Sequence, residues 1–205
     1  ISRVVSPLDR SVALLFGDAG SATLLEKKVG SQMNFVLGTD GTGTDKLIVP
    51  SGGFRQPLDE DNTVRKDFPD GNVRAGSDLY MNGPEIFAFT LGTVPKMIKE
   101  LIAMGEHQLD DYDAVVMHQA NKFMLEHLGK RIKLSSDKIV IGLEGFGNTS
   151  CASIPLALVS QMRDQLIRQD NKLILTGFGV GLSWAAMSCH LDRMVVPELI
   201  ILDEL

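Results

Sequence analysis

Hydrophobic residues recur at helical spacing after Gly83 and form short, uninterrupted runs elsewhere in the chain. The spacing predicts a helix that ends near Met104, with Pro84 in its first turn, where the missing N–H has no cost. Further helices are predicted over 123–132 and 154–167. The apolar face of the first predicted helix comprises Ile86, Phe89, Thr90, Val94, Met97, Ile98, Leu101 and Ile102.

Short apolar runs bounded by glycine or polar residues predict strands. The predicted strands are Ser11–Phe16, Ala22–Glu26, Met33–Leu37, Ala114–Met117, Lys138–Ile141, Leu173–Thr176 and Trp184–Leu191. Residues 38–78 hold many Gly, Pro and Asp residues without a period, so we expect a loop-rich excursion there. Strands that alternate with helices of this length indicate a layered α/β fold. The apolar and acidic tail, residues 192–205, is compatible with a final strand, a partner contact or a disordered end.

Composition narrows the class of protein. The 205 residues carry a net charge of −6, which argues against nucleic acid as a partner. The chain has 2 cysteines, too few for a disulfide framework, and no apolar stretch approaches the roughly 20 residues that cross a bilayer. We therefore expect a cytoplasmic protein that does not bind membranes. Because the chain begins with Ile1 rather than Met, we also expect a fragment, a processed product or a chain whose beginning is not present.

Polar or glycine-rich segments follow three of the predicted strands. His118 comes directly after 114–117, Asn148 lies in a glycine-rich stretch after 138–141, and GFGVG occupies 177–181. Since ligands bind at the carboxyl ends of strands in open α/β sheets, these segments predict one shared site. Backbone amides in the last segment are suited to an oxyanion hole.

Each of these features also has a purely structural interpretation. A histidine is often satisfied by nearby backbone groups, and Asn is a common helix N-cap, which fits both Asn121 and Asn148. The segment 177–181 fits a plain hairpin turn. These alternatives stay open when each segment is taken alone.

The ordered set of motifs resembles the β-ketoacyl-acyl carrier protein synthase III family. The resemblance rests on HQAN, GNTSCASIPLAL, GFGVGLSW, FGDAGSATLL and LDR, at 118–121, 147–158, 177–184, 16–25 and 8–10. It implies a thiolase-like fold with α-β-α-β-α layers that forms a homodimer. Residues 1–78 would end the N-terminal half and include the excursion, and 79–191 would form the C-terminal half. Residues 44–75 and the tail match no motif of the family.

The resemblance also implies an activity, decarboxylative Claisen condensation of an acyl thioester with malonyl-acyl carrier protein in fatty-acid or related biosynthesis. His118 and Asn148 match the family's catalytic pair, and the amide of Val180 matches an oxyanion position that is normally glycine. Acyl-CoA and malonyl-acyl carrier protein are the expected substrates, with no cofactor and no metal.

The same resemblance suggests how the thioester carrier is bound. Phe123 stands where the family often has an arginine that docks the carrier protein, and the neighbouring Lys122 is the alternative cation. The positions that match contacts to coenzyme A or its pantetheine arm are Arg10, Gly83, Phe87 and Asn121.

The family's nucleophilic cysteine precedes the position that matches Ile1, so the 205 residues alone are expected to be inactive. Cys151 fills a slot usually taken by alanine; it is either a small buried thiol or a reactive one near Asn148. Cys189 is expected in the core. Two other functions stay open: a catalytically silent partner subunit, and an acyltransferase of the same fold that uses a non-malonyl acceptor in secondary metabolism.

Overall fold

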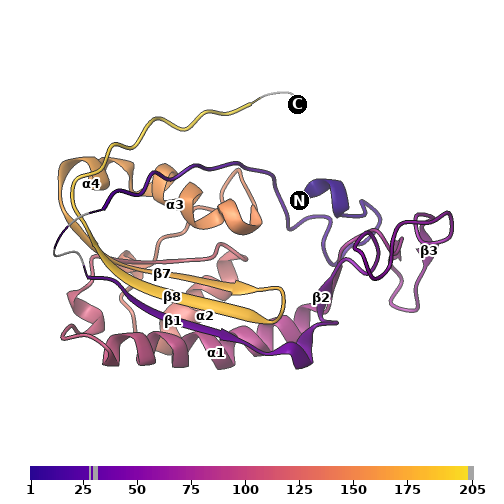
Figure 1. The fold of residues 1–205 in the computed structure, drawn as a ribbon, viewed down its shortest axis with the longest axis horizontal. Helices are drawn as coiled ribbons and strands as arrows, with labels where there is room; N and C mark the ends of the chain where they lie inside the picture. Colours follow the sequence, from indigo (N-terminus) through magenta and orange to yellow (C-terminus); the bar gives the residue numbers. More distant parts are fainter. Residues whose placement is uncertain (28, 30–31, 203–205) are drawn as a thin grey trace.

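A 4-stranded sheet with the order β1-β8-β7-β6 forms the centre of the computed structural model, which describes residues 1–27, 29 and 32–202 (Figure 1). β8 pairs antiparallel with both β1 and β7, whereas β7 and β6 are parallel. The carboxyl ends of β6 and β7 therefore meet at one edge of the sheet. The strands are β1 (Asn34–Thr39), β6 (Ala114–Met117), β7 (Asn171–Gly179) and β8 (Ser183–Leu191).

Helices cover both faces of this sheet, so the layered α/β arrangement is confirmed (Figure 1). α1 (Gly83–Ala103) and α2 (Lys122–Ile132) pack on one face, where Val115 and Met117 of β6 join their core. α3 (Ser153–Gln161) and α4 (Arg163–Arg168) cover the other face, which receives Ala114 and Val116. The alternation along one buried strand thus supplies both cores.

The predicted first two helices and their starting points are confirmed. Asn82 caps α1, because its side chain accepts a hydrogen bond from the backbone N–H of Glu85, and Pro84 lies in the first turn. Asn121 caps α2 in the same way, accepting from Met124 N at 2.8 Å. Both caps satisfy N–H groups that a helix leaves unpaired at its start.

The excursion is largely loop, as predicted, and Arg74 anchors it. The Arg74 guanidinium is buried, lies over the rings of Phe68 and Tyr80, and pairs with Asp9 and Asp70. Two pairs of short strands lie in and directly after the excursion. β2 (Leu47–Ile48) pairs with β5 (Tyr80–Met81), and β3 (Lys66–Asp67) pairs with β4 (Val73–Arg74).

The strands predicted over 11–16 and 22–26 are wrong. Residues 11–15 form turns, Phe16 makes a single bridge to Asn148, and 22–26 run as an irregular chain. Leu14 is 97% exposed and Leu24 84%. An apolar run becomes a strand only when a neighbouring strand takes up its N–H and C=O groups. Within the described residues, none lies alongside either segment.

The strand predicted over 138–141 is also wrong, although the segment lies beside β6. Only Ile139 forms a bridge there, to Val115. The buried side chain of Gln119 replaces the rest of the ladder: Nε2 donates to Val140 O at 3.1 Å, and Oε1 accepts from Gly142 N at 2.8 Å. A side-chain amide thus forms hydrogen bonds with backbone C=O and N–H groups that a neighbouring strand would otherwise have bonded.

Two boundaries differ from their predictions in the last third of the chain. The single helix predicted over 154–167 is two helices, α3 and α4, because the buried Met162 leaves helical geometry at φ −117° and ψ 3°. β7 continues to Gly179, so most of GFGVG is strand and the turn covers 180–182. The predicted strand over 184–191 is confirmed as β8.

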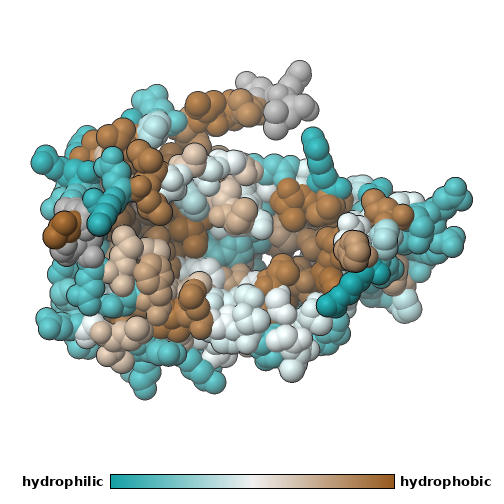
Figure 2. Space-filling model, in the orientation of Figure 1, coloured by the Kyte–Doolittle hydropathy of each residue, from teal (hydrophilic) through white to brown (hydrophobic). Residues whose placement is uncertain are grey.

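The described part of the tail, 192–202, contains no strand, and Met194 and Val196 pack against the core beneath α4. Val196 is buried in the core beneath α4, and its carbonyl accepts from Arg163 Nε at 3.0 Å. Val195 is 94% exposed, and the tail stands out as a hydrophobic extension in Figure 2. Residues 203–205 lie outside the described part. Among the described helices, none combines the length and hydropathy needed to cross a membrane.

Candidate active site

His118 lies where β6 ends, next to the last residues of β7. Its backbone N–H donates to Thr176 O at 2.7 Å, which continues the pairing of the two strands by one residue. Its Nδ1 lies 2.7 Å from the hydroxyl of Ser153, the first residue of α3. The ring of Phe178 meets the imidazole edge-on, with 5.4 Å between ring centroids. The imidazole is therefore held on two sides by elements distant in sequence.

Burial keeps this imidazole neutral at ordinary pH. It lowers the pKa of His118 to about 4, although a hydrogen bond with the backbone of Ser150 acts in the opposite direction. Desolvation disfavours the charged form of a base, and here it outweighs the one interaction that favours it. At neutral pH the ring is therefore one donor and one acceptor rather than a cation.

Asn148 is held by its backbone against the N-terminal segment. Its N–H donates to Leu15 O at 2.9 Å, and its carbonyl accepts from Gly17 N at 3.0 Å. Gly147 precedes it at φ +66°, where a side chain would be strained and its Cβ would lie 3.0 Å from Leu15 O. The end of the segment 11–16 and the adjoining Gly17 therefore hold the backbone of Asn148 in place.

A tight local turn orients the side chain of Asn148. Ser150 adopts a left-handed φ of 54°, and its N–H donates to Asn148 Oδ1 at 2.9 Å. This conformation is uncommon for a residue other than glycine and is found mostly where a site requires it. With Oδ1 occupied, Nδ2 has no hydrogen-bond partner in the described part of the chain. It is a donor available to a ligand.

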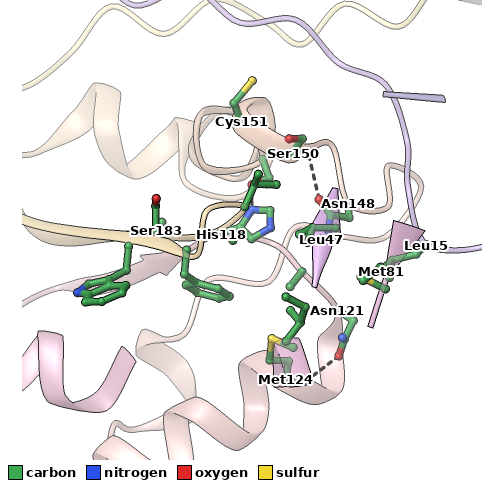
Figure 3. A pocket seen from close by; sticks show the side chains of 18 of the residues that line it. Leu15, Leu47, Met81, His118, Asn121, Met124, Asn148, Ser150, Cys151 and Ser183 are labelled. Carbon is green, nitrogen blue, oxygen red and sulfur yellow. Dashed lines mark hydrogen bonds between the residues drawn. The ribbon is translucent and has the colours of Figure 1, made fainter. Parts of the chain in front are cut away.

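His118 and Asn148 line one cavity of about 760 Å³ (Figure 3). The structure brings most of the predicted site residues to this cavity. Arg10 is the exception: it is exposed, and its backbone N–H bonds Asn72 instead. The predicted residues on the cavity wall are Gly83, Phe87, His118, Asn121, Asn148 and Val180.

Asn121 performs its capping role while it lines the cavity, so the capping interpretation is confirmed for this residue. Nearby, the ring of Phe87 stacks on Phe123 with 5.8 Å between centroids, and Phe123 is 65% exposed. His127 contacts both rings. An aromatic cluster on α1 and α2, half-buried at Phe87 and exposed at Phe123 and His127, thus lies beside the cavity.

Val180 occupies the hairpin between β7 and β8, and its side chain is 64% exposed. The hairpin interpretation of GFGVG is therefore confirmed for its last residues. The same turn borders the cavity, because Gly179 and Val180 both line it.

The two cysteines differ in environment. Cys151 is exposed, so the buried-thiol interpretation is wrong for it; it borders the cavity, but its sulfur points away from the His118 ring (Figure 3). Cys189 is buried, as predicted, and burial raises the pKa of its thiol to about 11.

Most of the cavity wall is uncharged. Its titratable side chains are the imidazole of His118 and the thiol of Cys151. A substrate carboxylate in this cavity would therefore lose water without gaining a cationic side chain nearby.

Sequence reasoning missed Ser153, Gln119 and Phe178 as parts of the site. Each lies in one of the motifs that carry the family resemblance. Their contacts with His118 or its neighbours are between different helices and strands, which the sequence does not show to be adjacent. The position of Ser153 at the start of a helix after a glycine-rich turn was the available signal.

Comparison with known proteins matches the chain to two models of one family. Residues 103–191 match the model described as 3-oxoacyl-[acyl-carrier-protein] synthase III C terminal, and residues 1–41 match 3-oxoacyl-[acyl-carrier-protein] synthase III. A β-ketoacyl-[acyl-carrier-protein] synthase III of Synechocystis is 36% identical over 187 residues, which cover 91% of this chain and 54% of the relative. The chain belongs to the β-ketoacyl-acyl carrier protein synthase III family.

Solved structures agree with this membership and with the thiolase-like fold. The 3-oxoacyl-(acyl-carrier protein) synthase of Burkholderia xenovorans LB400 superposes with a TM-score of 0.82 at 37% identity, covering 97% of this chain and 56% of that one. The priming β-ketosynthase of the R1128 polyketide pathway gives 0.66 at 28% identity, covering 93% and 55%. The chain spans about half the length of the relatives that it matches.

Proposed function

We propose that this chain carries the decarboxylation site of an acyltransferase that condenses an acyl thioester with malonyl-acyl carrier protein. The observation that carries the proposal is a neutral, buried His118 and a free Asn148 amide that line one largely apolar cavity. Membership of the synthase III family supports the same reaction class.

The proposed step begins with the bond between the malonyl methylene carbon and its carboxylate. This bond breaks, carbon dioxide leaves, and the electron pair moves into the thioester to form an enolate. Two N–H donors aimed at the enolate oxygen stabilise it more than the ground state. His118 Nε2–H and Asn148 Nδ2–H are the donors that we assign. The enolate carbon then attacks the acyl thioester, and the acyl group's sulfur departs.

The apolar wall contributes to this step. A carboxylate placed among uncharged residues loses hydration, whereas carbon dioxide needs none, so the wall favours departure. The Phe178 ring beside His118 keeps the imidazole dry. Acyl transfer places negative charge on the oxygen of the acyl thioester. We assign the stabilisation of this charge to the backbone N–H of Val180, in the hairpin at the cavity wall.

Carrier binding is proposed along the other side of the cavity. Gly83, Phe87 and Asn121 line it and are suited to a pantetheine arm, which needs apolar contact and a few polar groups. Arg10 lies outside the cavity wall, so we assign it to the distant nucleotide end of acyl-CoA. Phe123 offers an aromatic surface beside this path, and Lys122 the neighbouring charge for an acidic carrier protein.

The remaining parts of the proposal concern the whole protein. We expect acyl-CoA and acyl carrier protein as partners, a homodimer, a cytoplasmic location, and a reaction that uses no cofactor. Two alternatives remain: a silent partner subunit, and condensation with a non-malonyl acceptor. The similar R1128 priming β-ketosynthase belongs to a polyketide pathway, which supports a setting in secondary metabolism for the second alternative but does not bear on its acceptor.

The test is carbon dioxide release from malonyl-acyl carrier protein by the product of the complete gene. His118→Ala and Asn148→Ala are each expected to lower the rate by about 10²–10³, the usual loss for one such donor. His190→Ala, an exposed residue of β8, is the control and should keep the rate. Equal release in all three variants refutes the assignment. No release by the unmodified protein favours a silent subunit, and condensation without release favours another acceptor.

A further inference from the structure

Ser153 is a buried polar residue that the proposed mechanism does not yet use. Its side chain is at the first position of α3 and is 2% exposed. The hydroxyl lies 2.7 Å from His118 Nδ1. It also accepts a hydrogen bond from the backbone N–H of Gln119 at 3.3 Å. Both contacts come from the segment that follows β6, so Ser153 ties α3 to the end of that strand.

Proton counting fixes the direction of the bond from Gln119 and leaves two arrangements for the bond to His118. A hydroxyl has one proton to donate, and its oxygen already accepts from the Gln119 N–H, which can only donate. The hydroxyl keeps its proton and a second lone pair, so it can either donate to Nδ1 or accept from an Nδ1–H. A neutral imidazole carries one proton, and if Nδ1 accepts from Ser153 that proton must sit on Nε2.

We propose that Ser153 is a positioning residue that sets the tautomer of His118, so that Nε2 carries the proton. The inference rests on the proposed function, because a proton on Nε2 is what lets His118 donate to an enolate oxygen. Without the Ser153 hydroxyl, both neutral tautomers of His118 would be populated. The ring would also lose one of the two side-chain contacts that hold it, keeping the one with Phe178.

The surroundings of His118 support this role. Phe178 packs on the ring with no polar group to offer, and the strand neighbour Thr176 contacts only the backbone of His118 through its carbonyl. The other polar contact is the backbone of Ser150, which favours the protonated ring. The other titratable side chain that lines the cavity is Cys151. Among the described side chains, Ser153 is thus the one bonded to the ring.

The direct test is NMR of the imidazole nitrogens in the ¹⁵N-labelled chain, with the His118 signals assigned by their loss in His118→Asn. We expect Nδ1 at the shift of an unprotonated nitrogen and Nε2 at that of a protonated one. In Ser153→Ala both should move towards the averages of a tautomer mixture. A proton on Nδ1 in the unmodified chain, or an unchanged pattern in Ser153→Ala, overturns the inference.

A matched control and a kinetic readout complete the experiment. Thr176→Val removes another buried hydroxyl near His118, one without a hydrogen-bond partner, and should leave the tautomer unchanged. In the complete gene product, Ser153→Ala should lower kcat for decarboxylation about threefold to tenfold, the value of one neutral hydrogen bond, with KM unchanged. The NMR result does not need catalysis. If the tautomer is as expected but His118→Ala keeps full activity, the proposed function fails and the tautomer assignment stands.

Discussion

The side chain of Gln119 provides a sharp test of how the segment after β6 is held. It is 1% exposed and makes three hydrogen bonds to backbone groups. Nε2 donates to Met117 O at 2.6 Å and Val140 O at 3.1 Å, and Oε1 accepts from Gly142 N at 2.8 Å. Replacement by methionine keeps the length of the side chain and removes all three bonds.

The expected loss follows from these contacts. A neutral hydrogen bond contributes about 1 kcal/mol net, and a buried group left unpaired adds to the cost. With Val140 O and Gly142 N unpaired, we expect Gln119→Met to lower the free energy of unfolding by about 3–4 kcal/mol. That is a large fraction of the roughly 5–15 kcal/mol that stabilises a typical domain.

Urea unfolding followed by circular dichroism measures this loss as a lower midpoint at constant slope. The control is Gln161→Met on α3, whose exposed side chain makes one hydrogen bond within the described residues, to Ser160 Oγ at 3.3 Å, so the change should stay within about 0.5 kcal/mol. In Gln119→Glu the carboxylate faces two carbonyls, and stability should recover as the carboxyl is protonated at lower pH. A loss below about 1 kcal/mol in Gln119→Met would refute the reasoning.

The remaining predictions concern the titratable groups of the site. The pKa of folded His118 is about 4, below the 6.5 of a free imidazole, so between these values the unfolded chain takes up a proton that the folded chain excludes. Stability should therefore fall as the pH drops from 6.5 to 4, by up to about 3 kcal/mol. Urea unfolding at pH 7 and 4.5 should show this fall, and a fall of equal size in His118→Asn would contradict it. Iodoacetamide should label exposed Cys151 in the native protein and buried Cys189 only after unfolding; mass spectrometry showing equal labelling of both in the native state would contradict this.

The sequence by itself determined the elements whose pattern is local. α1, β6 and α2 begin and end close to their predicted residues, because helical periodicity, an all-apolar run and capping asparagines are properties of neighbouring residues. His118 could be placed at the end of a strand for the same reason. Its motif neighbours also carried the resemblance that family comparison confirmed.

Only the tertiary structure decided whether an apolar run becomes a strand. The segments 11–16 and 138–141 look alike in composition to β6, but a strand exists only where a neighbour supplies hydrogen bonds. For 138–141 the neighbour is partly a side chain, Gln119, and for 11–16 the partner is Asn148 alone. Such pairings join residues far apart in the sequence, and no local pattern encodes them.

The chemistry of the site also depends on contacts between residues that are far apart in the sequence. The sequence could nominate His118 and Asn148, but the contact between His118 and Ser153 spans 35 positions, and the depressed pKa arises from burial by several elements. Hydrogen bonding and desolvation depend on which groups surround a side chain in space. The residue types are therefore local information, whereas their protonation states and directions of donation belong to the fold.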